Sequence, residues 1–249
     1  MSYNWNWGIF FQLSPDGTHT YWQLLLFGTG WTLATALLAW VIALALGTAI
    51  GVIRTSPVPW LVRFGNAYVE LFRNIPLLVQ MFLWYFVLPE VVPEAIGDWL
   101  KQLNNASFYN AVICLGLYTS ARVAEQVKAG VLSLRSGQRM AGLAMGLTLP
   151  QTYRYILLPM AFRIILPPLS SEFLNIIKNS SVALTIGLIE LTAAARSMQE
   201  FSFRVFEAFT GATVIYIIIN IFVVNGMRWL ERRVAVPGFI SMGQPAAAH

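Results

Sequence analysis

Four polar side chains gather in an otherwise apolar stretch of this sequence, at spacings that suit solute binding. Glu172, Asn175 and Asn179 recur at i, i+3 and i+7, and Lys178 lies beside them. An amine and two amides can hydrogen-bond a carboxylate, and a carboxylate can hold an amine. At about 1.5 Å per residue, Lys178 falls near the middle of a bilayer, where an ionisable group is costly unless it meets a partner or water. We expect these side chains to line a solute path; the alternative is that Lys178 donates hydrogen bonds to carbonyls of a neighbouring helix.

A second polar cluster comes directly before a proline. Glu70, Arg73 and Asn74 share one helical face just before Pro76. In a regular helix a proline lacks the N–H donor, and its ring clashes with the carbonyl four residues earlier, here that of Phe72. We therefore predict a kinked or opened helix, and charged groups at a broken helix are typical of transport pathways. The alternative is that Arg73 and Glu70 only pair with each other near the cytoplasmic interface.

Tyr118, Arg122 and Glu125 form a third cluster, again on one face of a predicted helix. Arg122 and Glu125 are three residues apart and can pair with each other near the inner leaflet, which is the simpler interpretation. Glu172 offers a second carboxylate, either for the amine of a solute or for an ion pair with Arg73 or Arg122. These charged residues complete the candidates for a solute path.

Composition places the three clusters in a membrane protein. The chain is 57% hydrophobic and 11% charged, with a mean hydropathy of +0.63, which leaves too little polar surface for a water-soluble globule. Three runs without formal charge, 20–53, 102–121 and 208–227, reach or exceed the roughly 20 residues that a spanning helix needs. Two further stretches carry few charges and are too long and apolar for exposed loops. We predict a single all-α domain of five transmembrane helices, over residues 22–53, 64–92, 106–131, 164–189 and 207–230.

The distribution of lysine and arginine predicts the orientation of these helices. Most basic residues fall between the first and second helices, between the third and fourth, and after the fifth: Arg54, Arg63, Arg135, Arg139, Arg154, Arg163, Arg228, Arg232 and Arg233. The other side carries fewer: Lys101, Arg196 and Arg204. By the positive-inside rule the N-terminus lies outside and the C-terminus in the cytoplasm. The net charge of +5 is therefore a topology signal and does not indicate nucleic-acid binding.

Other chemistries find no support in the sequence. Cys114 is the chain's one cysteine, and His19 and His249 lie far from any ligand cluster, so we expect neither a disulfide nor a metal site. No Gly-Lys pair occurs, which excludes a phosphate-binding loop of the P-loop kind. Any work done with ATP must then be done by another chain.

Two packing features are also expected. Trp5 and Trp7 precede the first helix, in a stretch that lacks the basic region and cleavage site of a signal peptide, and we interpret them as part of an aromatic belt at the outer interface. Gly47 and Gly51 match the small-xxx-small pattern by which membrane helices approach one another closely.

The segment between the third and fourth helices, residues 132–163, is predicted to lie in the cytoplasm and to form two short helices. Helix formers follow Gly137, Gly146 can end the first helix, and Pro150 can begin the second. The first helix carries mostly small residues on one face, which suits close approach by another protein better than burial in lipid. We name residues 132–163 the docking segment, and its candidate contact residues are Gly137, Gln138, Ala141, Ala144, Met145, Gly146, Leu158 and Pro159.

Three motifs, in this order, resemble the inner-membrane permeases of bacterial ABC importers for polar amino acids. They are residues 70–80 (ELFRNIPLLVQ), residues 121–130 (ARVAEQVKAG) and residues 137–159 of the docking segment. The last is similar to the EAA motif of these permeases, the helix that inserts into a groove on the cytoplasmic ATPase. The resemblance covers nearly the whole chain.

Two details refine this resemblance. Met140, Ala141 and Gly142 stand where many relatives have Glu-Ala-Ala, so no acidic contact is expected at position 140. Residues 5–10, 144–150 and 236–238 resemble the glutamate/aspartate branch of the family. The resemblance therefore implies acidic amino acids as the substrate, with another polar amino acid, such as glutamine, arginine or histidine, as the alternative.

The resemblance also implies the partners and the location of the chain. It implies a five-helix subunit of the bacterial inner membrane with no catalytic residue, metal or cofactor of its own, since ATP is bound by a partner. The expected partners are a dimer of cytoplasmic ABC ATPases, a homologous second permease in a heterodimer or homodimer, and a periplasmic amino-acid-binding protein. Transport would proceed by alternating access, and the carboxylate of an acidic substrate would meet Lys178.

Two other classes of membrane protein are the alternatives. An ion-coupled secondary carrier of amino acids would also explain embedded charges and a broken helix. Such carriers typically contain inverted repeats, and we find no inverted repeat within the five predicted spans. A membrane-embedded enzyme would need a nucleophile, an acid/base group or a metal cluster converging in the bilayer, and no serine or histidine of this sequence supplies one. A requirement for a separate ATPase distinguishes an importer from an ion-coupled carrier.

Overall fold

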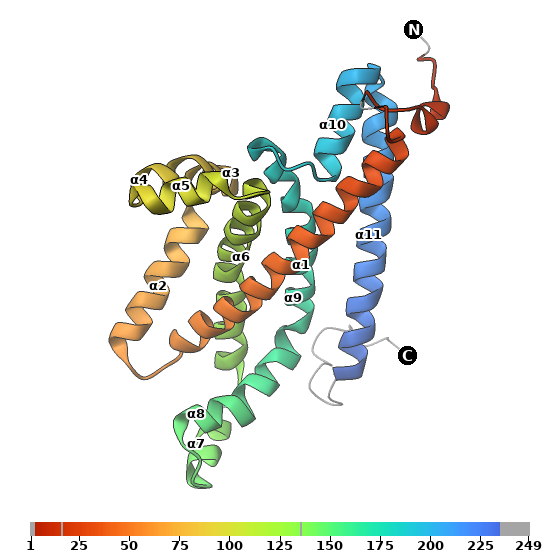
Figure 1. Cartoon of the computed structure of the whole chain (residues 1–249). Helices are drawn as coiled ribbons and strands as arrows, with labels where there is room; N and C mark the ends of the chain where they lie inside the picture. Colours follow the sequence, from red (N-terminus) through yellow and green to blue (C-terminus); the bar gives the residue numbers. More distant parts are fainter. Residues whose placement is uncertain (1–2, 16, 135, 235–249) are drawn as a thin grey trace, which may run out of the picture.

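A computed structural model describes residues 3–15, 17–134 and 136–234 (Figure 1). Within these ranges the chain is helical, with short connections and one isolated β-bridge, between Leu13 and Thr20. The predicted all-α class is confirmed. Arg135, His249 and the motif at residues 236–238 lie outside the described residues.

Four long helices form the body of the molecule, and shorter helices lie at their ends. The helices are α1 (Tyr21–Ile53), α2 (Pro59–Asn74), α3 (Leu77–Phe82), α4 (Leu88–Val91), α5 (Glu94–Gln102), α6 (Ala106–Ser133), α7 (Ser136–Ala144), α8 (Leu149–Thr152), α9 (Leu158–Asn179), α10 (Leu191–Ser202) and α11 (Val205–Val234). Helix α6 packs against both α1 and α9, and α9 packs against α11 (Figure 1). Helices α3, α4 and α5 lie near one end of α6, and α7 and α8 lie near the other (Figure 1).

Among the described residues, three helical segments are long and apolar enough to cross a membrane: Tyr21–Ile53, Leu149–Ile186 and Val205–Val234. A fourth candidate is the pair Pro59–Asn74 and Leu77–Val91, which meet at a bend of 100°. Helix α6, with 28 residues, has the length but is less apolar. The chain is thus an all-helical membrane protein with three or four spanning segments by length and composition, and the count of five stays a prediction.

The predicted helix at 164–189 is longer in the structure and begins inside the docking segment. The helical run starts at Leu149, because Thr148 forms a capping box with Gln151 and Pro150 occupies the first turn. A π turn at Tyr153–Leu157 joins α8 to α9, and a 3-10 turn at Ser180–Ile186 follows α9. The docking segment therefore continues without interruption into α9, so movement of one end can be transmitted along the helix.

The predicted break before Pro76 is confirmed as the bend between α2 and α3. Gln80, which is 2% exposed, turns its side chain back toward α2. Its Nε2 donates to the carbonyl of Phe72 at 2.8 Å and to the carbonyl of Ile75 at 2.9 Å. The glutamine amide thereby replaces the helical donors that the proline break removes, and it stabilises the bend.

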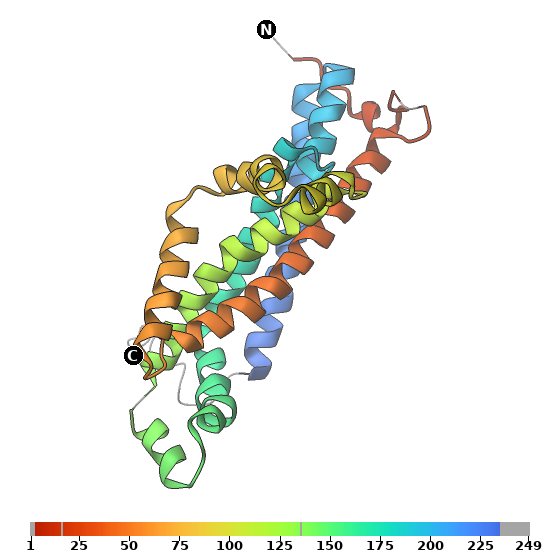
Figure 2. The ribbon, with the colours of Figure 1, turned by 60° about the vertical axis from the view of Figure 1, so that its left-hand side comes forward.

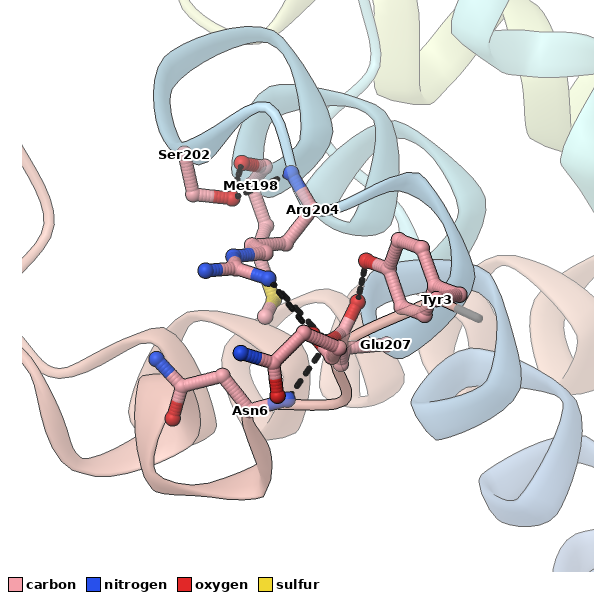
Figure 3. Close-up of polar contacts among 7 residues, drawn as sticks. Tyr3, Asn6, Met198, Ser202, Arg204 and Glu207 are labelled. Atoms are coloured by element: carbon pink, nitrogen blue, oxygen red, sulfur yellow. Dashed lines mark hydrogen bonds and ion pairs between the residues drawn. The ribbon is translucent and has the colours of Figure 1, made fainter. Parts of the chain in front are cut away.

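The N-terminal arm, residues 3–14, is held against the start of α11 (Figure 2). Figure 3 shows that the contacts converge on Glu207, a fully buried residue in the first turn of α11. Its carboxylate accepts hydrogen bonds from the Tyr3 hydroxyl and, at 2.8 Å, from the Asn6 N–H group, and it lies 3.9 Å from Arg204. The hydrogen bond to Glu207 raises the pKa of Tyr3 above its usual value.

Aromatic side chains cover the outer surface of this arm. The rings of Trp5 and Trp7 stack with centroids 5.0 Å apart, and both side chains stay about half exposed. Tyr3 packs edge-on against Phe206 of α11. Exposed indole rings beside the end of an apolar helix suit the interface between lipid and water, in line with the predicted aromatic belt.

Helices α1 and α6 approach closely because α1 carries glycines at their contact. A Cβ atom at Gly47 would lie 2.6 Å from the Cβ of Val123 and 2.7 Å from the carbonyl oxygen of Ser120. A Cβ atom at Gly51 would lie 2.7 Å from the Cβ of Val127. No larger residue fits unless the helices separate, so the predicted close contact at Gly47 and Gly51 is confirmed.

Replacing Gly47 by alanine should push α1 away from α6 and destabilise the protein by about 1–3 kcal/mol. Gly30 lies in the same helix with open space around it, and Gly30→Ala should leave stability unchanged or raise it slightly, because alanine favours helix. Thermal unfolding of both variants in the same detergent checks this expectation. Equal melting temperatures for the two variants would contradict the tight contact.

Candidate functional site

The structure brings the predicted charged residues of three separate segments to one cavity. This cavity, of about 520 Å³, opens between α2, α6 and α9 and is lined by Arg73, Arg122, Glu125, Gln126, Ala129 and Glu172. We name it the charged cavity. Two guanidinium groups and two carboxylates face a space large enough for a small polar solute, and such groups can bind opposite charges by hydrogen-bonded ion pairs.

The ion pairs of the charged cavity join different helices. Arg73 of α2 binds Glu125 of α6 at 3.1 Å, and Arg122 of α6 lies 3.9 Å from Glu172 of α9. The pairing of Arg73 with Glu70, and that of Arg122 with Glu125, were therefore wrong expectations. Glu70 lies exposed on α2, while both arginines reach carboxylates on the neighbouring helix across the cavity. Of the alternatives left open for Glu172, the ion pair with Arg122 is the one that forms within the described part of the chain.

Arg122 is held by its own helix as well. Its Nη2 donates to the Tyr118 hydroxyl at 2.8 Å, and its guanidinium lies over the Tyr118 ring, 5.0 Å from the centroid. Gln126, one turn further along α6, donates to Glu172 at 3.3 Å. The predicted face of Tyr118 and Arg122 is thus the face of α6 that lines the charged cavity.

Arg54, at the end of α1, belongs to the same network, and the sequence arguments missed it. Its Nη2 donates to Glu125 at 3.0 Å and its Nε donates to Asn66 at 2.9 Å, while only 6% of its side chain is exposed. Gly65 of α2 makes room for the arginine stem, because a Cβ atom there would lie 2.5 Å from Cγ of Arg54. Arg54 was counted only as a topology signal; a basic residue at the end of an apolar run gives no indication of which carboxylate it meets.

The polar stripe on α9 does not act as one unit in the structure. Glu172 lines the charged cavity, Asn175 and Asn179 are half-buried, and Lys178 is exposed. No hydrogen bond or ion pair joins the Lys178 amine to another described residue of the chain. The alternative role of Lys178, as a donor to carbonyls of a neighbouring helix, is therefore not formed within this chain.

The docking segment contains the first short helix that the sequence predicts, α7, whereas the predicted second short helix is the beginning of the longer helical run Leu149–Ile186. Gly146, with φ of 84°, ends α7 in the left-handed conformation that glycine adopts readily. The N–H of Leu147 then reaches back to the carbonyl of Gly142 at 3.2 Å. Pro150 lies in the first turn of α8. The predicted roles of Gly146 and Pro150 in ending and beginning these helices are confirmed.

The candidate contact residues of the docking segment are mostly accessible. Ala141 and Ala144 of α7 are exposed, and so are Gly137, Met145, Gly146 and Pro159, whereas Gln138 and Leu158 are half-buried. Gly142 is instead buried inside the segment, where a Cβ atom would lie 2.9 Å from side-chain atoms of Thr152 and Ile156. One face of α7 therefore packs on the following helical run, and the face with Ala141 and Ala144 stays open.

A buried carboxylate directly before α10 was also not identified from the sequence. Glu190 is fully buried and caps α10, accepting hydrogen bonds from the N–H groups of Thr192 at 2.9 Å and Ala193 at 2.8 Å. It also accepts one from the Tyr216 hydroxyl at 3.1 Å. The available signal was a single acidic residue directly before a helix-forming run, where a side-chain acceptor can cap the helix.

The described part of the chain contains no group of three or more His, Cys, Asp or Glu side chains that could hold a metal ion. What its polar groups offer is electrostatic binding of a charged solute in the charged cavity, together with an open helical surface at the docking segment.

Comparison with known proteins shows which family the sequence matches. Residues 42–236 match the family model described as the binding-protein-dependent transport system inner membrane component. The glutamate/aspartate import permease protein GltJ of Escherichia coli is 48% identical over 241 residues, which cover 96% of this chain and 98% of the relative. The probable glutamine ABC transporter permease protein GlnM of Bacillus subtilis is 37% identical over 204 residues, covering 79% of this chain and 88% of the relative.

Solved structures share the fold. A chain in the crystal structure of an amino acid ABC transporter with histidines superposes with a TM-score of 0.72 at 30% identity, covering 86% of this chain and 95% of that chain. The inward-facing MetNI methionine ABC transporter gives a TM-score of 0.73 at 21% identity, covering 90% of this chain and all of that chain, and at that identity the likeness concerns the fold alone.

Proposed function

We propose that this chain, which belongs to the family of inner membrane components of binding-protein-dependent transport systems, is the membrane-spanning subunit of an ATP-driven importer for glutamate and aspartate. The observation that supports this choice of substrate is the 48% identity to a glutamate/aspartate import permease along 96% of the chain. The glutamine permease named above is less similar, at 37% identity over 79% of the chain, so glutamine, arginine and histidine are the second choice.

The charges around the cavity support an acidic substrate. The network of Arg54, Arg73, Arg122, Glu125 and Glu172 contains one more guanidinium group than carboxylates. Glutamate and aspartate carry one net negative charge at neutral pH, because both carboxyl groups are ionised and the amine is protonated. An acidic amino acid therefore balances a positive excess that an uncharged amino acid would leave unpaired.

Lys178 is the second group that we place on the solute path. Its exposed amine extends from α9, six residues after the Glu172 carboxylate that lines the charged cavity. We propose that it faces the homologous second permease across the transport pathway, where it meets the carboxylate of the substrate. Asn175 and Asn179, on the same helix, supply hydrogen bonds to that carboxylate.

For the arrangement in the membrane we propose five spans with the N-terminus outside and the C-terminus in the cytoplasm of a bacterial cell. The spans are α1, the bent pair of α2 and α3, α6, the run from α8 through α9, and α11. The arginines at the end of α1 and near the start of α2, in the docking segment and at the end of α11 support this orientation. The aromatic arm then lies at the outer face.

The partners follow from this orientation. The docking segment would receive a dimer of cytoplasmic ABC ATPases, which bind the ATP, so the chain needs no cofactor of its own. A homologous second permease would complete the pathway, and a periplasmic amino-acid-binding protein would deliver the substrate. The exposed face with Ala141, Ala144 and Met145 suits insertion into a groove, because small side chains let another backbone approach closely.

The central experiment is uptake by the reconstituted complex. The chain, co-purified with its ATPase, second permease and binding protein, should accumulate labelled glutamate and aspartate in proteoliposomes only when ATP is present on the ATPase side. Glutamine at the same concentration should be taken up at least tenfold more slowly. Uptake that follows an ion gradient without the ATPase would identify a secondary carrier and refute the proposal.

Removing the Lys178 charge tests the solute path in the same preparation. Lys178→Met keeps the length of the side chain and should lower glutamate and aspartate uptake at least tenfold, while the complex assembles and hydrolyses ATP at its basal rate. Lys101→Met is the matched control, since Lys101 lies in α5 and pairs with Glu90. Unchanged uptake in Lys178→Met, or loss of assembly, would remove Lys178 from the path.

Cysteine labelling tests the orientation and the docking surface together. With Cys114 buried, a membrane-impermeant thiol reagent should label Ala144→Cys only from the cytoplasmic side and Gln102→Cys only from outside. Added ATPase should protect Ala144→Cys at least fivefold and leave Gln102→Cys unaffected. Labelling from the opposite sides would overturn the five-span arrangement.

A further inference from the structure

A continuous chain of short polar contacts joins the docking segment to the charged cavity. Tyr153, in the π turn between α8 and α9, donates its hydroxyl to the carbonyl of Thr55 at 2.8 Å and to its side-chain oxygen at 3.0 Å. Thr55 directly follows Arg54, which donates to Glu125 at 3.0 Å. The same oxygen of Glu125 accepts from Arg73 at 3.1 Å. Hydrogen bonds and the short backbone link between Thr55 and Arg54 therefore connect the docking segment with an ion pair that faces the cavity.

The two arginines that bind Glu125 differ in how firmly they are held. The Arg54 side chain is 6% exposed and fits a slot over Gly65, with Asn66 as a second acceptor. The Arg73 side chain is 52% exposed and has Glu125 as its ion-pair partner. A buried guanidinium loses far more than an exposed one when its carboxylate is removed. When the end of α1 moves, Glu125 therefore stays with Arg54, and its contact with Arg73 is the one that breaks.

The connection to the docking segment lies where the helix is irregular. Tyr153 is the first residue of the π turn Tyr153–Leu157, and single π turns inside α-helices are frequent at functional sites. The Tyr153 hydroxyl connects this turn to Thr55, which lies directly after the end of α1 and next to Arg54.

We infer that Arg54 is the positioning residue that carries movement of the docking segment to the charged cavity. When the docking segment moves, Tyr153 displaces Thr55 and Arg54, Arg54 takes Glu125 with it, and Arg73 is left unpaired toward the cavity. The cavity then presents one additional free positive charge to the solute. The inference rests on the proposed function, because the ATPase supplies the displacement.

The test uses the intact complex with a reporter in the cavity. Ala129 lines the charged cavity and is exposed, so Ala129→Cys can be labelled with a thiol reagent, and the chain's one natural cysteine, Cys114, is buried. The labelling rate is measured without nucleotide and after ATP hydrolysis in the presence of vanadate, which traps the ATPase with bound ADP and vanadate. On the otherwise unchanged chain, trapping should alter the rate at least fivefold.

Tyr153→Phe removes only the two hydrogen bonds to Thr55 and should reduce this nucleotide-dependent change to less than twofold. It should also lower the substrate transported per ATP hydrolysed at least threefold, while assembly and melting temperature stay as in the unchanged complex. Tyr155→Phe is the matched control, because Tyr155 lies in the same turn, is 62% exposed and donates no hydrogen bond to another described residue. The control should keep the full fivefold change.

Arg54→Lys provides a second variant, which keeps the charge and loses the forked geometry that reaches Glu125 and Asn66 together. It should reproduce the loss of the nucleotide-dependent change seen with Tyr153→Phe. A full response in Tyr153→Phe, an equal loss in Tyr155→Phe, or disassembly of the Tyr153→Phe complex would each overturn the inference. A complex that shows no ATP-driven uptake before any substitution would instead refute the proposed function.

Discussion

Charged side chains in a largely apolar helix bundle need partners, and in this protein the partners come from neighbouring helices. Arg54 of α1, Arg73 of α2, Glu125 of α6 and Glu172 of α9 are paired in this way. An isolated charge in an apolar surrounding is unfavourable by several kcal/mol, so each pair constrains where two helices can lie. The helix arrangement around the charged cavity therefore follows from a few electrostatic contacts, more than from the apolar faces that lie against lipid.

These contacts need helices that lie close together, and glycine provides the closeness. Gly47 and Gly51 let α1 settle against α6, and Gly65 gives the stem of Arg54 its place against α2. Membrane helices gain little from burying apolar surface against each other, since lipid is as apolar as their side chains. Close backbone packing and charge pairing thus act together: the glycines bring the helices within reach, and Arg54 and Glu125 hold them there.

Local features of the chain could be predicted from the sequence because their causes are local. Pro76 removes a helical hydrogen bond wherever the helix packs, and Gly146 ends a helix through its own backbone freedom. The partners of the charges could not be predicted in the same way. Spacing within one helix suggested Glu70 for Arg73, but the choice of Glu125 depends on how α2 lies against α6, which no single segment encodes.

The residues that the sequence arguments overlooked share a further property: each ties together parts of the chain that are far apart in sequence. Glu207 holds the N-terminal arm through Tyr3 and Asn6, and Arg54 reaches Glu125, which lies 71 residues further along the chain. Their residue types are ordinary for helix ends, so only the fold distinguishes them from solvated charges.

Lys178 is the opposite case, because its position in an apolar run marks it as a candidate from the sequence alone, yet within one chain its amine is exposed. A lysine amine in an apolar segment that finds no partner within its own chain needs one from outside it. The paired charges therefore account for contacts within the single subunit, whereas Lys178 is the charge for which the proposed second permease and substrate carboxylate would supply the partner.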